Sequence, residues 1–271
     1  MPEMKTRGKT MLEHYLSQDE GARLGRPGHS RLELLRTREL LAQHLPGAPA
    51  RVLDVGGGTG VHAAWLADRG YSVHLVDPVP VHVERARAHG GFTASQGDAR
   101  SLAEPSGSVD AVLLLGPLYH LVEKDDRLRA LAEARRVLRL GGVVAAGAIG
   151  RYMALLTYCA DGDLDPDRLT KLLPTLETGR YDPSLDFTDA YFHRPEELAE
   201  ELICAGFEDV RILGIEGPAW TAVDAAGPDS EGHMNSALLC ARAVEEDRAL
   251  LPASAHLFAV GRVPSRSGGA V

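Results

Sequence analysis

The sequence predicts an α/β fold, a doubly wound and mostly parallel sheet with helices on both faces. Apolar runs that suit strands alternate with helical segments from residue 51 onward, as in successive βαβ units. One run, Val109 to Leu115, is apolar almost throughout, which is typical of a strand buried on both faces in a parallel sheet. Seven strands are expected, over residues 51–55, 71–76, 92–96, 109–115, 143–148, 210–215 and 256–263.

The expected helices fill the intervals between these strands, and glycine or proline marks most of their ends. Two helical pieces precede the first strand within residues 11–45. Further helices are expected over residues 61–69, 81–89, 118–138, 195–205 and 236–250. The helix over 118–138 is the longest of these, because leucines recur along it at helical spacing.

The first strand runs into a glycine-rich turn, and a helical segment follows at once. Four residues stand there at alternate positions, namely Asp54, Gly56, Gly58 and Gly60. Such a turn lets the backbone approach a ligand closely and presents free amides at a helix N-terminus. A dinucleotide-binding turn has the spacing G-x-G-x-x-G, and Val61 stands where its third glycine would be. The dinucleotide template therefore fails.

The string D-x-G-x-G-x-G over residues 54–60 resembles motif I of the class I S-adenosylmethionine-dependent methyltransferases. Further segments also match the pattern of this family. They are Asp77-Pro78, Gly97-Asp98-Ala99 and Leu115-Gly116, at the ends of predicted strands, and the connection Arg136 to Gly142. The resemblance covers roughly residues 51–148 and implies a Rossmann-like methyltransferase fold that binds S-adenosylmethionine.

The resemblance also implies a role for each matching residue. Asp77 accepts the ribose hydroxyls, Asp98 accepts the exocyclic amine of adenine, and the Ala99 amide meets a ring nitrogen. Asp54 holds the turn near the methionine moiety, or only orients the loop without touching ligand. An N-terminal helix with Tyr15 and Arg23 is a candidate to close over the cofactor, where an arginine can pair with a carboxylate.

Two histidines are candidate general bases, because imidazole titrates near neutral pH. His120 follows the fourth strand beside Tyr119, at the edge where doubly wound sheets place their sites. His193 precedes the helix that resumes the fold. Contact with cofactor alone or a helix-capping role would explain these residues too, and a carboxylate acceptor needs no base. Gly116-Pro117-Leu118-Tyr119 departs from the N-P-P-[YF] tetrapeptide, which argues against a DNA or glutamine acceptor.

The regular pattern pauses between residues 151 and 193, where half of the chain's twelve tyrosines and phenylalanines gather. Aromatic side chains suit an organic substrate, although packing of the segment onto the sheet would also explain them. We expect a helical cap over 1–45, a cofactor-binding core over 46–150, a substrate lid over 151–193, the completed sheet over 194–263 and a flexible tail over 264–271.

Composition excludes several other functions. The formal charge of −9 argues against a nucleic-acid partner, which needs concentrated positive charge. Three cysteines without a C-x-x-C pair suggest neither a disulfide framework nor a zinc site, and we expect no metal. No apolar stretch reaches the length of about 18–20 residues that a membrane span needs, and the polar first ten residues lack a signal-peptide pattern.

The sequence therefore predicts a cytoplasmic enzyme, monomeric or homodimeric, that methylates a small organic molecule. Oxygen is favoured as the acceptor atom over nitrogen or carbon. Two alternatives remain open: a cofactor-binding relative that transfers no methyl group, cyclase-like or regulatory, and an NAD-dependent oxidoreductase.

Overall fold

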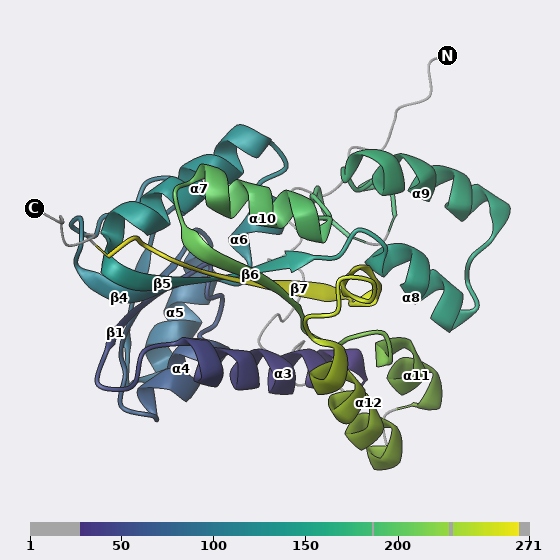
Figure 1. Ribbon diagram of the computed structural model, residues 1–271, viewed down its shortest axis with the longest axis horizontal. Helices are drawn as coiled ribbons and strands as arrows, with labels where there is room; N and C mark the ends of the chain where they lie inside the picture. Colours follow the sequence, from purple (N-terminus) through teal and green to yellow (C-terminus); the bar gives the residue numbers. More distant parts are fainter. Residues whose placement is uncertain (1–27, 186, 228–229, 266–271) are drawn as a thin grey trace, which may run out of the picture.

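The computed structural model describes residues 28–185, 187–227 and 230–265, which fold around one seven-stranded sheet (Figure 1). The spatial order is β3-β2-β1-β4-β5-β7-β6. The strands are β1 (Arg51–Val55), β2 (Ser72–Asp77), β3 (Thr93–Gln96), β4 (Val109–Leu114), β5 (Leu138–Ile149), β6 (Glu208–Gly214) and β7 (His256–Arg262). Only β7 among these strands runs opposite to its neighbours, β5 and β6. The predicted doubly wound, mostly parallel sheet is confirmed.

Helices cover both faces of the sheet (Figure 1). On one face, α3 (His29–His44), α4 (Val61–Ala67) and α5 (Pro80–His89) pack against β1, β2 and β4 through buried aliphatic residues. On the other face, α7 (Lys124–Val137) and α10 (Pro195–Cys204) pack against β4, β5 and β7. The core therefore consists of two apolar layers, one on each side of the central strands.

The prediction of one long helix over residues 118–138 was wrong, because two helices occupy this stretch. A single turn, α6 (Pro117–His120), is followed by a break and then by α7. The Arg127 guanidinium reaches back from α7 and donates to the carbonyls of Leu121 (2.9 Å) and Val122 (2.7 Å). The break therefore has a side-chain partner in place of helical ones, an arrangement that leucine spacing does not reveal.

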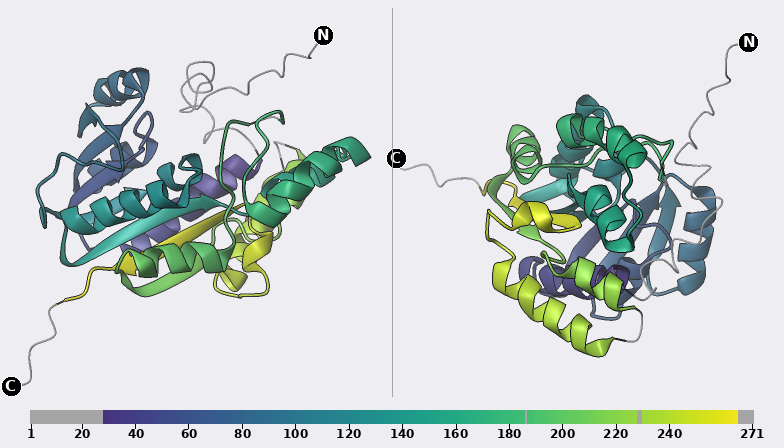
Figure 2. Two further views of the ribbon diagram at one scale, coloured as in Figure 1. Left: turned by 90° about the horizontal axis from the view of Figure 1, so that it is seen from above. Right: turned by 90° about the vertical axis from the view of Figure 1, so that its right-hand side faces the viewer.

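The segment after β5 carries two helices, α8 (Met153–Asp161) and α9 (Pro166–Thr178), which extend beyond the end of the sheet (Figure 2). Its two ends meet, since Gly150 and His193 form a β-bridge. Arg151 holds the ends together by donating to the Phe192 carbonyl at 2.8 Å and by pairing with Glu197 at 2.6 Å. The segment thus leaves the sheet and returns to it at one place.

The C-terminal part completes the molecule with α11 (Trp220–Ala226), α12 (Glu231–Val244) and a short 3-10 helix (Leu251–Ala253) before β7. The Trp220 indole is fully buried and donates to the Ala253 carbonyl at 3.0 Å. No helix in the described part of the chain has the length and apolar character to cross a membrane.

A buried ion pair joins α7 to α10. Arg127 and Glu201 are each 2% exposed, and the guanidinium donates to both carboxylate oxygens at 2.7–3.0 Å. The same guanidinium stacks on the Tyr191 ring, 3.8 Å from its centroid. One cation therefore ties together the α6–α7 break, helix α10 and the end of the α8–α9 segment.

Replacement of one member of this pair should be costly, because the other charge would stay buried without a partner. We expect Glu201→Ala to lower the free energy of unfolding by about 3–5 kcal/mol in urea titrations. The matched control is Glu246→Ala, which removes the exposed pair with Arg211 and should cost less than about 1 kcal/mol. Equal losses in the two variants would contradict this account.

Candidate active site

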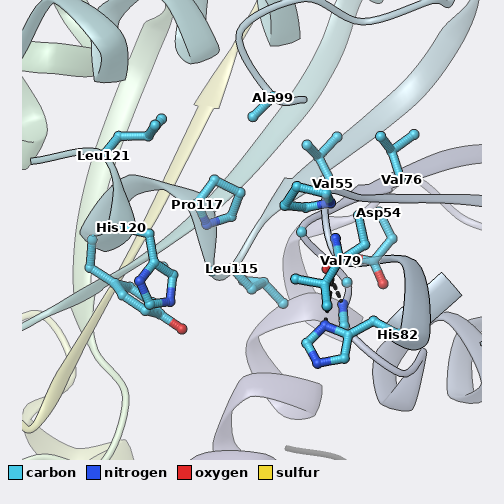
Figure 3. A pocket seen from close by; sticks show the side chains of 18 of the residues that line it. Asp54, Val55, Val76, Val79, His82, Ala99, Leu115, Pro117, His120 and Leu121 are labelled. Carbon is cyan, nitrogen blue, oxygen red and sulfur yellow. Dashed lines mark hydrogen bonds and ion pairs between the residues drawn. The ribbon is translucent and has the colours of Figure 1, made fainter. Parts of the chain in front are cut away.

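The main cavity lies at the edge where the parallel strands end and has a volume of about 530 Å³ (Figure 3). Successive strand ends supply its wall. Ten of the predicted cofactor residues line it, namely Asp54, Gly56, Gly58, Asp77, Pro78, Gly97, Asp98, Ala99, Leu115 and Gly116. Tyr15 and Arg23, the other predicted cofactor contacts apart from Gly60, lie outside the described residues.

The glycine-rich turn is held against the end of β2. The Gly56 amide donates to the Val76 carbonyl at 2.6 Å, and the Gly58 amide donates to Asp77 Oδ2 at 2.9 Å. Gly56 and Gly58 have φ values of 70° and 58°, which side chains rarely allow. A Cβ on Gly56 would also lie 2.7 Å from the Pro117 ring. The turn therefore needs glycine both for its conformation and for its close packing against Pro117 at the start of α6.

Gly60 has a different structural role from Gly56 and Gly58, the other two predicted glycines of the turn. It is the N-cap of α4 with φ of 92°, and a Cβ there would lie 2.5 Å from the Phe92 ring. In the described structure, Gly60 is buried and packs between α4 and the start of β3. Gly60 is therefore needed to start helix α4 and to pack against Phe92. It is not among the residues that line the main cavity, so the predicted direct contact with the cofactor is not supported.

Asp77 organises the loops around it. Its side chain is nearly buried, and besides the Gly58 amide it accepts the Val79 amide at 2.9 Å and contacts His82 Nδ1 at 3.2 Å, both through Oδ1. A carboxylate has about four lone-pair sites, so three contacts leave room for a ligand hydroxyl. The sequence pattern indicated a ligand-binding role, and the structure adds that the same carboxylate fixes the turn.

Asp54 is buried at the base of the turn, with 1% of the residue exposed. Burial, and to a lesser degree the negative charge of Asp77, raises the pKa of Asp54 to about 7. Its Oδ2 has no hydrogen-bond partner among the described residues. A Cβ on Gly57 would lie 2.6 Å from that oxygen. A polar atom this deeply buried and unpaired at a cavity wall suits a site that a cationic ligand completes.

Asp98 lies on the rim of the cavity and is paired with Arg100. The guanidinium and the backbone amide of Arg100 donate to the carboxylate at 2.6–3.3 Å. The hydrogen bond from Arg100 is the main reason that the pKa of Asp98 is lowered, so the group is ionised at neutral pH. It is therefore a permanent acceptor at the end of β3, next to the Ala99 amide.

The structure separates the two predicted histidine bases. His120 lines the main cavity, with its ring 4.5 Å from that of Tyr119 and 5.9 Å from that of Phe187. Figure 3 shows it across the cavity from His82, with Leu115 and Pro117 between. Both predicted catalytic residues of this segment, Tyr119 and His120, are thus placed at the cavity.

His193 lies away from the cavity, whereas a general base has to lie within hydrogen-bond reach of the substrate. It is fully buried, and its Nε2 lies 3.3 Å from Glu201 Oε2. Burial lowers the pKa of His193 more than Glu201 raises it, so the ring is neutral and donates to Glu201. Among the described residues, those lining the two cavities do not include His193. Its role is to pack the return of the α8–α9 segment onto α10.

A second cavity of about 420 Å³ adjoins the first and is lined in part by α8. Its wall is largely apolar and aromatic and includes Ile149, Met153, Tyr158, Tyr181, Phe187 and Phe192. Several of these residues also form a buried cluster, so the aromatic residues pack the segment and line a cavity at once. Tyr119 and His256 line both cavities, so the two cavities are neighbours at these two residues.

Sequence reasoning missed His256, together with Glu33 and Thr37 of α3, which line the main cavity. The strand that begins near residue 256 was predicted, but not that its first residue would reach the cavity. Because β7 runs antiparallel, its first residue pairs with Ile149 at the end of β5. That pairing is the signal that brings a C-terminal histidine to the site.

The fold and the site together define a class of protein. A doubly wound sheet with a glycine turn after β1 and acidic residues after β2 and β3 is the architecture of a nucleoside-cofactor-binding protein. Gly58 has a positive φ and open space where a Cβ would lie. Because no side chain fills that space, one side of the cavity is clear for such a ligand.

Comparison with known proteins gives the family. A family model described as a methyltransferase domain matches residues 52–142. A rice (Oryza sativa subsp. japonica) 2-methyl-6-phytyl-1,4-hydroquinone methyltransferase is 33% identical over 201 residues, which are 72% of this chain and 49% of that protein. A Xanthomonas oryzae pv. oryzae ubiquinone biosynthesis O-methyltransferase is 32% identical over 188 residues, or 67% of this chain and 72% of that one. The chain thus spans about half the length of the rice protein.

A solved structure supports the fold independently. An S-adenosylmethionine-dependent methyltransferase from Methanosarcina mazei superposes with a TM-score of 0.57 at 18% identity, covering 84% of this chain and 98% of that one. The chain belongs to the class I S-adenosylmethionine-dependent methyltransferases, and S-adenosylmethionine is the cofactor of that family.

The raised pKa of Asp54 should appear in the pH dependence of stability. The folded protein keeps this proton up to about pH 7, whereas the unfolded chain releases it near 3.8. Stability from this group is therefore fully present below the unfolded pKa and is lost as the pH rises toward 7, by up to about 1.4 kcal/mol per pH unit.

The variant Asp54→Asn cannot ionise and should lose that slope in urea titrations at a series of pH values. Asp125→Asn, at an exposed position in the first turn of α7, is the matched control and should keep it. A slope that is the same in Asp54→Asn and in the parent protein would refute the shifted pKa.

Proposed function

We propose that this protein transfers the methyl group of S-adenosylmethionine to a hydroxyl oxygen of a small organic acceptor. The observation that carries the proposal is the meeting of two cavities of different character at the carboxyl edge of the sheet. One is bordered by the glycine turn and by carboxylates that include Asp54, Asp77 and Asp98, and the other is mainly apolar and aromatic. A polar cofactor and an apolar acceptor can therefore be bound side by side.

Residues of the main cavity fit the parts of the cofactor. Asp77 is placed to accept ribose hydroxyls, Asp98 the adenine amine, and Gly56 and Gly58 offer backbone beside the methionine portion. The buried carboxyl of Asp54 keeps its proton up to about pH 7, and a cationic ligand bound beside it would favour the ionised form and so gain a negative charge close by. Bound there, the sulfonium supplies an electrophilic methyl group. The protein then has chiefly to align the acceptor, which contributes about 7–11 kcal/mol toward the barrier.

Three observations support a small acceptor with a hydroxyl group. The second cavity has a volume of about 420 Å³, which is within the range of small-molecule sites. Its aromatic side chains offer large flat apolar surfaces. Two relatives carry names that refer to hydroquinone methylation and to O-methylation in ubiquinone biosynthesis. The segment over residues 151–193 is accordingly proposed as the substrate lid.

A histidine near the reacting atoms is expected if the acceptor arrives as a protonated hydroxyl. His120 lines the main cavity, whereas His193 is buried against Glu201. Of the two predicted bases, only His120 therefore remains a candidate. The monomeric or homodimeric state and the cytoplasmic location stay predictions.

The non-methylating alternative shares the same cofactor site, so the products decide between them. A methyltransferase incubated with S-adenosylmethionine labelled in the methyl group and with a metabolite extract forms S-adenosylhomocysteine and a labelled acceptor in equal amounts. Labelled S-adenosylmethionine that is bound but returned unchanged would support the alternative.

The cofactor assignment predicts the effect of Asp98→Ala. This change removes a charged acceptor and should weaken S-adenosylmethionine binding in calorimetry by about 1.5–3 kcal/mol, or roughly 10- to 150-fold. Asp98 is about half exposed in its side chain, so the fold should survive the change.

The control for this binding experiment is Asp125→Ala, which removes an exposed carboxylate of α7 and should bind like the parent protein. An unchanged affinity in Asp98→Ala would remove the adenine contact from the proposal.

A further inference from the structure

The second cavity, the aromatic cavity, has an acidic end. Two carboxylates belong to its wall, those of Asp161, the last residue of α8, and of Asp163 just beyond it. Among the described residues, no lysine or arginine lines this cavity. The two imidazoles of the wall, those of His29 and His256, each lie 2.6–2.7 Å from a carboxylate of their own. The wall therefore carries more negative than positive charge.

Helix α8 connects this acidic end to the cofactor. The residues of α8 that line the cavity recur at the spacing of one helical face, and they are Met153, Ala154, Thr157, Tyr158 and Asp161. The helix begins shortly after Ile149, which pairs with His256, a residue of both cavities. From the first to the last residue of α8, the axis rises by about 12 Å. The aromatic cavity thus has one end beside the cofactor cavity and one end at the carboxylates.

Asp161 carries the charge that the protein leaves uncompensated at that end. Its side chain is exposed and makes no hydrogen bond or ion pair with any described residue. An acidic residue in the last turn of a helix is unfavourable, because the C-terminal carbonyls already carry partial negative charge. Asp163 differs, since Arg168 lies 3.5 Å from its carboxylate. A residue that breaks a local rule without compensation is expected at functional sites.

The aromatic wall next to Asp161 suits a cation as well. The face of an aromatic ring is negative and attracts ammonium and guanidinium groups. The Tyr158 ring already has one such contact, because the Arg168 guanidinium lies 5.0 Å from its centroid. Tyr158 lines the cavity one turn before Asp161. A ligand ammonium at this end would meet the carboxylate, the helix C-terminus and aromatic rings together. Because Asp161 is exposed, the ammonium would also keep part of its water.

We propose that the methyl acceptor is a cation, a small apolar molecule with its hydroxyl at one end and a protonated amine at the other, bound through Asp161 and the Tyr158 ring. The inference rests on the proposed function and deepens it by naming the substrate class. The hydroxyl lies at the end beside the cofactor cavity, and the amine lies at the C-terminus of α8. After contacts at both ends are allowed for, a rise of about 12 Å leaves room for one aromatic ring and a two-carbon linker.

Charge recognition also directs the methyl group to oxygen. A protonated amine has no lone pair, so it does not attack the methyl carbon while Asp161 holds it. The hydroxyl oxygen forms the bond to the methyl carbon, and the electron pair of the broken carbon–sulfur bond stays on sulfur. The hydroxyl proton leaves to solvent. The products are a methyl ether that keeps its ammonium group, S-adenosylhomocysteine and one proton.

Three ligands with the same ring and linker test the charge preference. Tyramine, 4-propylphenol and 3-(4-hydroxyphenyl)propionate end in an ammonium, a methyl and a carboxylate group. Their dissociation constants are measured by calorimetry with S-adenosylhomocysteine present, so the result does not depend on whether they are methylated. Tyramine should bind at least about 10-fold tighter than the propionate, because Asp161 and the ring faces attract one charge and repel the other. The propyl compound gives the affinity of the ring and linker alone.

One variant assigns this preference to Asp161. Asp161→Asn keeps the shape of the side chain and should reduce the preference for tyramine over the propionate by about 2- to 30-fold. The matched control is Asp167→Asn, which removes an exposed carboxylate in the first turn of α9, away from the cavity wall. It should keep the preference of the parent protein. Both variants should bind S-adenosylhomocysteine like the parent protein.

The charge of the natural acceptor gives an independent test. Labelled product from the metabolite extract, once separated from S-adenosylmethionine, should migrate as a cation in electrophoresis at pH 7. A neutral or anionic product would overturn the inference and leave the proposed function intact. Equal binding of tyramine and the propionate, or one preference shared by Asp161→Asn and the parent protein, would also overturn it. If the extract yielded no labelled product, the proposed function would fail, and the three ligands would still decide the charge preference of the cavity.

Discussion

The site depends on the attachment of the glycine turn to the end of β2. Two hydrogen bonds hold it, from the Gly56 amide to the Val76 carbonyl and from the Gly58 amide to Asp77. They require left-handed backbone at both glycines and a backbone that passes directly under Pro117. With the turn fixed in this way, β1, β2 and β4 all end at one cavity. The same carboxylate that fastens the turn remains at the cavity wall, so the loop and the ligand site are held by one side chain.

A second constraint comes from the direction of β7. Parallel strands bring only their last residues to the functional edge, whereas the antiparallel strand contributes its first one, His256. The buried Glu216 accepts the amide of His256 because the end of β6 and the start of β7 lie side by side there. On the other face of the sheet, the Arg127–Glu201 pair anchors the segment that lines the aromatic cavity.

Local patterns in the sequence predicted most of the fold and ten residues that line the main cavity. Strand-helix alternation gave the seven strands, and the spacing of Asp54, Asp77 and Asp98 placed their side chains near strand ends. Contacts between different elements of the fold account for what was missed. The break after His120 depends on a guanidinium from the next helix, burial of His193 depends on Glu201, and the position of His256 depends on sheet order. None of these follows from periodicity in one segment.

Cofactor binding by the full chain is the most direct test of the central claim that this edge of the sheet holds an adenosyl sulfonium. Calorimetric titration with S-adenosylmethionine and, separately, with NAD compares the two ligands that a glycine-rich turn can serve. The account predicts saturable binding of S-adenosylmethionine with one site per chain and no measurable binding of NAD. Tight binding of NAD without binding of S-adenosylmethionine would contradict it.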